Sequence, residues 1–371
     1  MTVATTTTTT QPTIAGKKKM APLEPQPIRP SQGPLKSTWH KPENKSSWGF
    51  HHWMIHLFGI DPIPQNATAV HHNKDDPMPV WNNFTHHIWI AMRILPAIGL
   101  QYLYMQWAGR NFHPIANILY WGTFVSLFGS NLLNVLRSVA SKVGYLQADA
   151  ARDGVPDVRV TQVLNSLLMT AFFRPAAATL VIYNRDEPMK LSPWLPLMMP
   201  LYSLAIDFWF YWYHRVMHES DALWKFHRTH HTAKHPTPIL SLYADMEQEW
   251  FDVVFVPLLA YFTIKPIVSM SYYDWIFCWT HVMFIELTGH SGIRAFGGPP
   301  AFDLVSWPMR KLGMELTIED HDLHHSRGWK TSGNYGKQTR VWDKLFGTIL
   351  PRQESLDEQI DHTTKISLPQ F

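Results

Sequence analysis

Three histidine clusters constrain the fold of this chain more than any other feature of its sequence. Side chains three or four residues apart on a helix share one face, with about 5–6 Å between Cβ atoms, so each cluster directs its imidazoles toward one point. A metal ion takes about four to six ligands, so eight histidines favour two metals side by side. The clusters are His214-Arg-Val-Met-His218, His227-Arg-Thr-His230-His231 and His321-Asp-Leu-His324-His325.

A chance origin of this pattern has to be weighed first. One HxxxH pair is common by chance, but two HxxHH triplets in a chain without a poly-histidine tract are not, so we interpret the clusters as metal-binding. The 371 residues include 21 histidines and a single cysteine, Cys278. One thiol excludes a disulfide-stapled fold, a cysteine zinc finger and an iron–sulfur cluster. Imidazole and carboxylate ligands suit iron, zinc or manganese.

A further histidine and an acid follow on an apolar helix. His290 lies four residues after Glu286, so the two share a face. We expect His290 to be a ligand, and Glu286 to be a ligand or to support one, because an acid in the membrane normally has a functional partner. His281 lies nine residues before His290 and falls on the opposite face, so we expect a structural role for it.

Two further groups of acids lie near the clusters. Asp207 precedes His214 by seven residues on the same helical stripe, and we expect it to orient a neighbouring histidine through its ring N–H. The alternative is an interfacial aspartate that faces water. The acids after the second triplet are expected to lie on a solvated helix face; they are Asp245, Glu247 and Glu249.

Long apolar segments begin near residue 85. Charged residues make up only 16% of the chain, against about 25% in soluble domains. A crossing helix needs about 20 residues, and several segments approach this length. We predict an all-α fold, a polytopic membrane helix bundle of about four transmembrane helices with a cytosolic helical cap that holds a di-metal site. The segments are residues 88–108, 115–136, 195–213, 251–270 and 272–287, with 167–182 re-entrant or interfacial because Arg174-Pro175 interrupts it.

The chain divides by composition into five parts. We expect residues 1–47, rich in Thr, Pro and Lys, to be disordered, and 48–84 to be a polar linker. Residues 85–194 hold the N-terminal membrane helices and their connection, 195–350 the catalytic domain, and 351–371 a C-terminal tail. Lys and Arg after residue 213 and in the C-terminal region place the histidine clusters on the cytosolic face. The net charge of +3, without an arginine-rich block, argues against nucleic acid as a partner.

Four motifs, in this order, resemble the fatty acid hydroxylase/sterol desaturase superfamily, and are nearest in style to sterol C4-methyl oxidase and cholesterol 25-hydroxylase. The resemblance spans roughly residues 195–350 and includes the ending Asn334-Tyr-Gly336. The motifs are Asp207-Phe-Trp-Phe-Tyr-Trp-Tyr-His214-Arg-Val-Met-His218, Phe226-His-Arg-Thr-His-His231, Gly289-His-Ser-Gly292 and His321-Asp-Leu-His-His325.

This resemblance implies a non-haem di-iron oxygenase of the endoplasmic reticulum membrane, with zinc as a possible substitute in a preparation. The sequence contains neither a dinucleotide fingerprint nor a haem signature, so a separate cytochrome b5 and an NAD(P)H-dependent reductase are implied as electron donors. The implied metal ligands are His214, His218, His227, His230, His231, His321, His324 and His325, with His290 matching the family's His-Ser-Gly segment.

The predicted activity is O₂-dependent hydroxylation of a sterol or another lipid-like or polycyclic apolar metabolite. Attack on an unactivated C–H bond is beyond side-chain chemistry and requires a redox metal. Desaturation of a sterol or lipid by the same site is an alternative. A zinc transporter or metal sensor, and an inactive relative that keeps its metal for folding, are alternatives of other classes. Transport is disfavoured because the clusters follow the apolar spans and adjoin basic residues.

Overall fold

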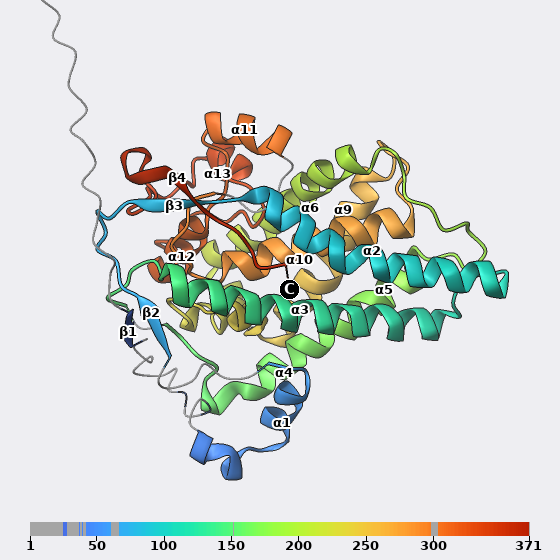
Figure 1. Ribbon diagram of the computed structural model, residues 1–371, viewed down its shortest axis with the longest axis horizontal. Helices are drawn as coiled ribbons and strands as arrows, with labels where there is room; N and C mark the ends of the chain where they lie inside the picture. The colour runs from blue at the N-terminus through green and yellow to red at the C-terminus, as the bar shows by residue number, and fades with distance from the viewer. Residues whose placement is uncertain are drawn as a thin grey trace, which may run out of the picture.

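The computed structural model describes residues 25–27, 37, 39, 42–60, 67–150, 152–297 and 303–370. Most of the predicted disordered tail, residues 1–47, lies outside these ranges. The described chain is mostly helical, as predicted (Figure 1). The helices are α1 (Phe50–Leu57), α2 (Asn83–Ala108), α3 (Pro114–Val143), α4 (Val160–Leu168), α5 (Arg174–Val181), α6 (Leu195–Glu219), α7 (Asp221–His227), α8 (Met246–Glu249), α9 (Val256–Ile264), α10 (Tyr272–Gly289), α11 (Asp303–Lys311), α12 (Ile318–Arg327) and α13 (Val341–Phe346).

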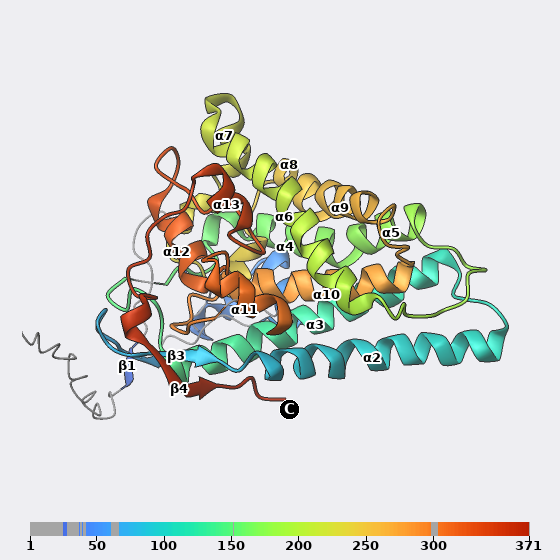
Figure 2. The same ribbon diagram turned by 90° about the horizontal axis from the view of Figure 1, so that it is seen from above.

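Helix α10 occupies the centre of the bundle (Figure 2). It contacts α2 and α3 on one side and α6 and α12 on the other. A capping box starts it, because the Ser271 hydroxyl accepts from the Asp274 amide and the Asp274 carboxylate accepts from the Ser271 amide. Polar residues within the predicted segments 88–108 and 115–136 bond to one another across α2 and α3. Arg93 Nε donates to Asn131 Oδ1 at 2.8 Å, and Gln101 Nε2 donates to Asn117 Oδ1 at 3.1 Å.

Two short sheets depart from the all-α prediction. Strands β1 (Pro25–Pro27) and β2 (Thr68–Val70) pair antiparallel, and β3 (Met78–Trp81) and β4 (Ile360–Ile366) pair parallel. The second pair joins the predicted linker, residues 48–84, to the predicted tail, residues 351–371 (Figure 1). The C-terminal segment is therefore part of the folded body.

Two helical stretches of the described chain are long and apolar enough to cross a membrane. They are α2 and the segment Asp157–Val181, which comprises η2 (Asp157–Arg159), α4, the π-helical η3 (Met169–Phe173) and α5. The second overlaps residues 167–182. About four crossings remain a prediction, because only these two pass this test among the described helices.

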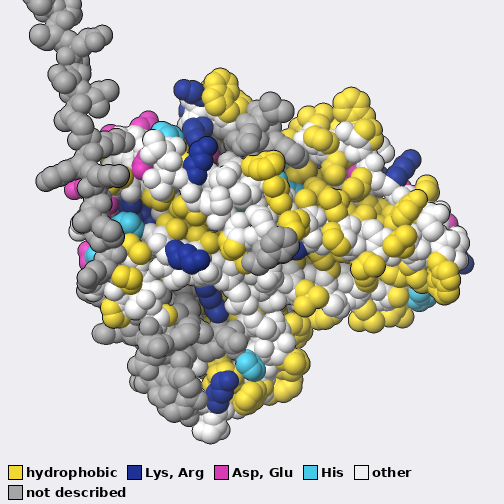
Figure 3. All heavy atoms as spheres, in the orientation of Figure 1, with side chains coloured by type: hydrophobic (Ala, Val, Ile, Leu, Met, Phe, Trp, Pro, Cys, Tyr) yellow, Lys and Arg dark blue, Asp and Glu magenta, His cyan; other side chains and the backbone are white. Residues whose placement is uncertain are grey.

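Apolar side chains gather on one end of the molecule. Figure 3 shows them over the right-hand half, where Figure 1 places the ends of α2, α3 and α5 that are distant from α12. Leu103, Trp107, Ile115 and Leu180 are all more than half exposed there. This end of the bundle is therefore suited to apolar surroundings.

Candidate metal centre

The structure brings all nine predicted histidine ligands together in two adjacent groups. The nine histidines come from the end of α6, from α7 and the short helix η4 (His230–Thr232), from the residue after α10, and from α12. Within each group, the possible ligand nitrogens lie within 4.8 Å of one another. The larger group is His214, His218, His227, His231 and His324, and the smaller is His230, His290, His321 and His325.

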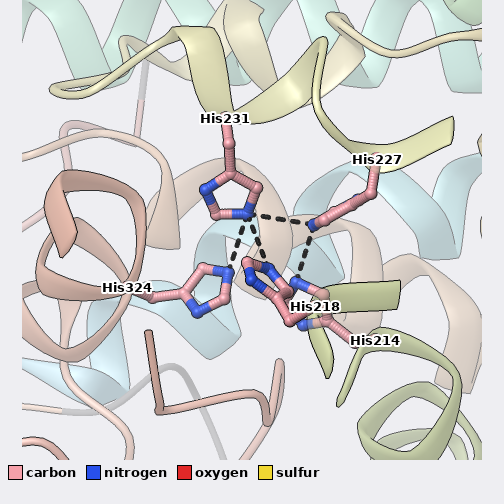
Figure 4. Close-up of side chains that lie close together, drawn as sticks. All are labelled: His214, His218, His227, His231 and His324. Atoms are coloured by element: carbon pink, nitrogen blue, oxygen red, sulfur yellow. Dashed lines mark hydrogen bonds between the residues drawn. The ribbon is translucent and has the colours of Figure 1, made fainter. Parts of the chain in front are cut away.

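His231 lies at the middle of the larger group (Figure 4). Its Nε2 lies 3.0 Å from the Nε2 atoms of His218, His227 and His324. His214 Nε2 lies 2.9 Å from His227 Nε2. One imidazole nitrogen has either one hydrogen or one lone pair, so it cannot make three hydrogen bonds at once. The distances fit a shared metal instead, because ligands about 2.1 Å from an octahedral or tetrahedral ion lie about 3.0–3.4 Å apart.

The opposite ring nitrogens determine the tautomers. Nδ1 can only donate to a carbonyl oxygen, so Nε2 of the same neutral ring carries a bare lone pair. Most of the nine rings make such a bond. Facing lone pairs repel each other unless a cation lies between them. The bonds run from Nδ1 of His214 to Tyr335 O (2.9 Å), His218 to Trp329 O (3.1 Å), His230 to Tyr243 O (3.2 Å), His290 to Glu286 O (2.8 Å), His324 to Gly333 O (2.7 Å) and His325 to Ala233 O (2.9 Å).

The smaller group shows the same arrangement. His290 Nε2 lies 2.9 Å from His321 Nε2 and 3.4 Å from His230 Nε2. His325 Nε2 is buried without a hydrogen-bond partner. A buried polar atom without a partner is costly, and a metal ion would satisfy it.

Burial keeps these rings neutral. All nine are at most 6% exposed. Burial, with the neighbouring imidazoles, lowers the pKa of His231 and His324 well below the usual range and that of His325 to about 3. Neutral imidazole is the form that binds metals, so the site is ready for one at physiological pH.

Gln248 is a supporting residue that the sequence pattern did not reveal. His227 Nδ1 donates to Gln248 Oε1 at 2.9 Å, and Gln248 Nε2 donates to Asp252 Oδ2 at 3.1 Å. A carboxylate only accepts, so Asp252 determines which way the amide points, and the amide determines the His227 tautomer.

Asp207 does not hydrogen-bond to a histidine, in contrast to the prediction. Its carboxylate accepts from the backbone amides of Lys337 (2.6 Å) and Gln338 (2.9 Å) and from the Thr339 hydroxyl (2.6 Å). It thereby holds the C-terminal end of the loop of residues 329–338, which we name the orienting loop, while Asp343 accepts from the Tyr335 and Gly336 amides of the same loop. Carbonyls of this loop accept from three of the histidines, so Asp207 acts on the rings through the backbone.

The Glu286 carboxylate does not belong to either histidine group. It forms an ion pair with Lys337 Nζ at 2.6 Å, and only its backbone carbonyl meets His290. Glu286 therefore supports the predicted ligand His290 only through its backbone carbonyl and not through its carboxylate. His281 lies apart from both groups, as expected, and its Nδ1 donates to Phe277 O at 3.1 Å.

One of the three acids that were predicted to lie on a solvated helix face is buried. Glu249 is 4% exposed, which corrects that prediction, whereas Glu247 is exposed as expected. Asp245 is half-buried, and its carboxylate accepts a hydrogen bond from Thr229 Oγ1 at 2.5 Å.

A small pocket lies next to residues that support the histidines, although none of the nine histidines lines it. Its enclosed volume is about 50 Å³, and the empty space reaches about 640 Å³ when the part open to solvent is included. Its wall includes Asp252, which reaches His227 through Gln248, and Glu286, whose carbonyl accepts from His290. The remaining wall is more apolar than polar, and α3, α4 and α10 contribute to it together with η5 (Pro238–Leu242), the π-helical η6 (Trp250–Phe255), α5 and α8.

Comparisons with known proteins concern mainly the histidine-bearing half. Residues 199–348 match the fatty acid hydroxylase family model. Fatty acid hydroxylase vlmA of Lecanicillium sp is 43% identical over 230 residues, which are 59% of this chain and 62% of that protein. Alkylglycerol monooxygenase of Xenopus tropicalis is 26% identical over 55% of this chain and 44% of its own length. Methylsterol monooxygenase 1-1 of Arabidopsis thaliana is 25% identical over 51% of this chain and 62% of its own.

These matches leave part of each relative uncovered, because the chain spans between 44% and 62% of the length of these three proteins. No solved structure matches the chain.

Proposed function

We propose that this chain is a membrane-bound non-haem di-iron oxygenase of the fatty acid hydroxylase/sterol desaturase superfamily, because residues 199–348 match the fatty acid hydroxylase family model and its relatives include hydroxylases and monooxygenases. It hydroxylates a C–H bond of a sterol or another lipid-like apolar metabolite. The relatives are named hydroxylases and monooxygenases, which supports the predicted oxidoreductase activity.

The observation that carries this proposal is the convergence of Nε2 lone pairs in two adjacent groups. One group of five and one of four histidines suit two ions, and an all-nitrogen set without thiolate suits iron. Two irons, when bound, would supply O₂ activation and abstraction of a substrate hydrogen. The protein holds the rings neutral and oriented through the orienting loop and Gln248, so that little reorganisation accompanies metal binding.

We place the chain in the endoplasmic reticulum membrane with about four crossings and the histidine groups at the cytosolic face. The apolar end of the bundle supports this placement, because it lies away from α12 (Figures 1 and 3). Residues 85–194 would anchor the protein, and residues 195–350 would form the catalytic domain.

The pocket supports a lipid substrate. Its apolar wall includes Val125, Leu133, Leu167 and Met283. Relatives named for alkylglycerols and methylsterols act, by their names, on lipids. An apolar molecule that enters from the bilayer would bury its hydrocarbon against this wall.

Electrons would come from cytochrome b5 and an NAD(P)H-dependent reductase. Trp224 lies 5.0 Å from the His218 ring and stacks on Trp329, with ring centroids 5.6 Å apart. Trp329 is exposed, and the exposed basic residues Lys225 and Arg228 belong to the same part of the chain as Trp224. An acidic electron carrier that docks there would lie beside Trp329, and Trp224 would connect Trp329 to His218 of the larger histidine group.

The test combines metal analysis with lipid profiling. The chain is expressed in membranes, its bound metals are measured, and sterols and lipids are compared by mass spectrometry with those of His231→Ala. The expected result is bound iron and an oxidised lipid that the variant lacks. Identical lipid profiles under broad substrate feeding would contradict the proposal, and altered zinc uptake without oxidation would favour a transporter.

A further inference from the structure

The pocket beside the histidine groups contains buried polar atoms that lack hydrogen-bond partners. Ser241 Oγ and Asp252 Oδ1 are buried without a hydrogen-bond partner, and both residues line this pocket. Ser166 also lines it, and its hydroxyl hydrogen-bonds to the Glu249 carboxyl. Most buried polar groups have partners, so two unpaired atoms around one cavity indicate a ligand group that fits between them.

We infer that this pocket binds the hydroxyl group of a lipid, with Asp252 and Ser241 as its hydrogen-bond partners. The inference rests on the proposed function and specifies its substrate class, a lipid alcohol.

The unpaired carboxylate oxygen requires a donor. Asp252 Oδ2 already accepts from Gln248 Nε2, whereas Oδ1 has no partner. A ketone, an ether or an ester oxygen only accepts and would leave Oδ1 unpaired, but a hydroxyl donates to it and accepts from a serine. The cost of an unpaired buried acceptor would then discriminate against lipids without a hydroxyl.

The charges around the pocket favour a neutral ligand. Arg174 Nε donates to the Val253 carbonyl at 2.9 Å, and Lys337 forms the ion pair with Glu286. Burial, with the nearby Asp252 carboxylate, raises the pKa of Glu249 to about 8, so Glu249 is mostly neutral at pH 7. The two positive charges of Arg174 and Lys337 are then balanced by the two negative charges of Asp252 and Glu286. An amine or a carboxylate on the ligand would upset this balance, whereas a hydroxyl would not.

The shape of the pocket suits a hydrocarbon attached to that hydroxyl. Small residues of α3 line one side, and Ser126, Gly129 and Ser130 among them are partly exposed. A Cβ added at Gly129 would meet nothing within 4 Å, so there is open space at this point. The two unpaired polar atoms lie on η5 and on the π-helical η6, where Asp252 connects through Gln248 to His227. A bound hydroxyl would thus lie near the metal centre, with its chain directed between α3 and α4.

The experiment measures binding to the purified full chain in detergent, without O₂ or an electron donor, so it does not depend on oxidation. The probes are two pairs of equal size, a long-chain secondary alcohol with its ketone and a sterol with its ketone. We expect wild type to bind at least one alcohol about tenfold more tightly than its ketone, as one buried hydrogen bond provides. The pair that shows the preference indicates whether the ligand is a long-chain alcohol or a sterol.

Asp252→Asn sharpens the test. The Asn carbonyl can accept from Gln248, which turns its amide donor toward the pocket, so the preference should vanish or reverse in favour of the ketone. Asp186→Asn, an exposed aspartate in a surface ion pair with Arg110, is the matched control and should keep the wild-type ratio. If Asp252→Asn does not fold, Ser241→Ala should reduce the preference about threefold.

Three results would overturn the inference: equal binding of alcohol and ketone by wild type, no binding of any probe, or an alcohol preference that survives both Asp252→Asn and Ser241→Ala. The proposed function would fail separately, through absence of bound iron or of an oxidised lipid.

Discussion

His231 Nε2 lies 3.0 Å from His324 Nε2, although 93 residues separate the two in the chain. His230, the immediate neighbour of His231, belongs instead to the other group with His290. One short segment therefore serves both groups and connects them. Removal of single histidines should consequently affect one metal position more than the other.

The metal content of single variants tests this division. His324→Ala removes a ring from the group of five and His290→Ala one from the group of four. His290→Ala leaves three rings and should lower bound metal from about two to about one ion per chain, whereas His324→Ala leaves four rings and should weaken the binding of one ion. Elemental analysis of purified protein measures this. His281→Ala, which removes a buried histidine outside both groups, should retain both ions. Full metal content in His290→Ala would refute the assignment.

Asp207 should control metal affinity without touching a metal. Asp207→Ala frees Lys337 and Gln338 at one end of the orienting loop and leaves Asp343 to hold the Tyr335 residue whose carbonyl orients His214. We expect affinity to fall about 10–100-fold, as for other residues that orient ligands. Asp207→Asn retains one oxygen that can accept from the backbone amides, so it should recover part of the lost metal affinity. Competition with a chelator gives the affinities, and equal affinity of wild type and Asp207→Ala would show that the loop does not need this carboxylate.

The Lys337–Glu286 ion pair should show strong coupling. Lys337→Met leaves the Glu286 carboxylate without its cation in a largely buried place, and such a break costs about 3–5 kcal/mol. The double variant Lys337→Met/Glu286→Leu removes both charges and should be more stable than the single one. Thermal unfolding in detergent compares them. Additive losses in the double variant would mean that the pair is not coupled.

Acid should destabilise the metal-free protein. Burial holds the pKa of His321, His324 and His325 below the unfolded value of about 6.5. The folded state then stays neutral while the unfolded state gains protons, so stability is complete above pH 6.5 and falls as the pH decreases toward about 3. The loss is up to about 1.4 kcal/mol per histidine and pH unit. Unfolding with chelator at pH 7.5 and 5.5 tests this, and unchanged stability would contradict it.

Helical spacing singled out the histidine clusters as candidate ligands. The expectation that each cluster points at one site was wrong, because His321 and His324, three residues apart on α12, belong to different groups. The mostly helical fold also followed from a local signal, the apolar segments. The spacing also separated His281 from His290 on α10, and the structure places His281 outside both groups.

Only the tertiary structure decided how these residues are divided and supported. The distribution of His230 and His231 to different groups depends on α10 and α12, which no local pattern places. Glu286 pairs with Lys337, 51 residues away, and Asp207 holds a loop 130 residues away. Glu249 is buried because the pocket wall closes around it. Local periodicity determines which face a side chain occupies, but its partner depends on packing between distant segments.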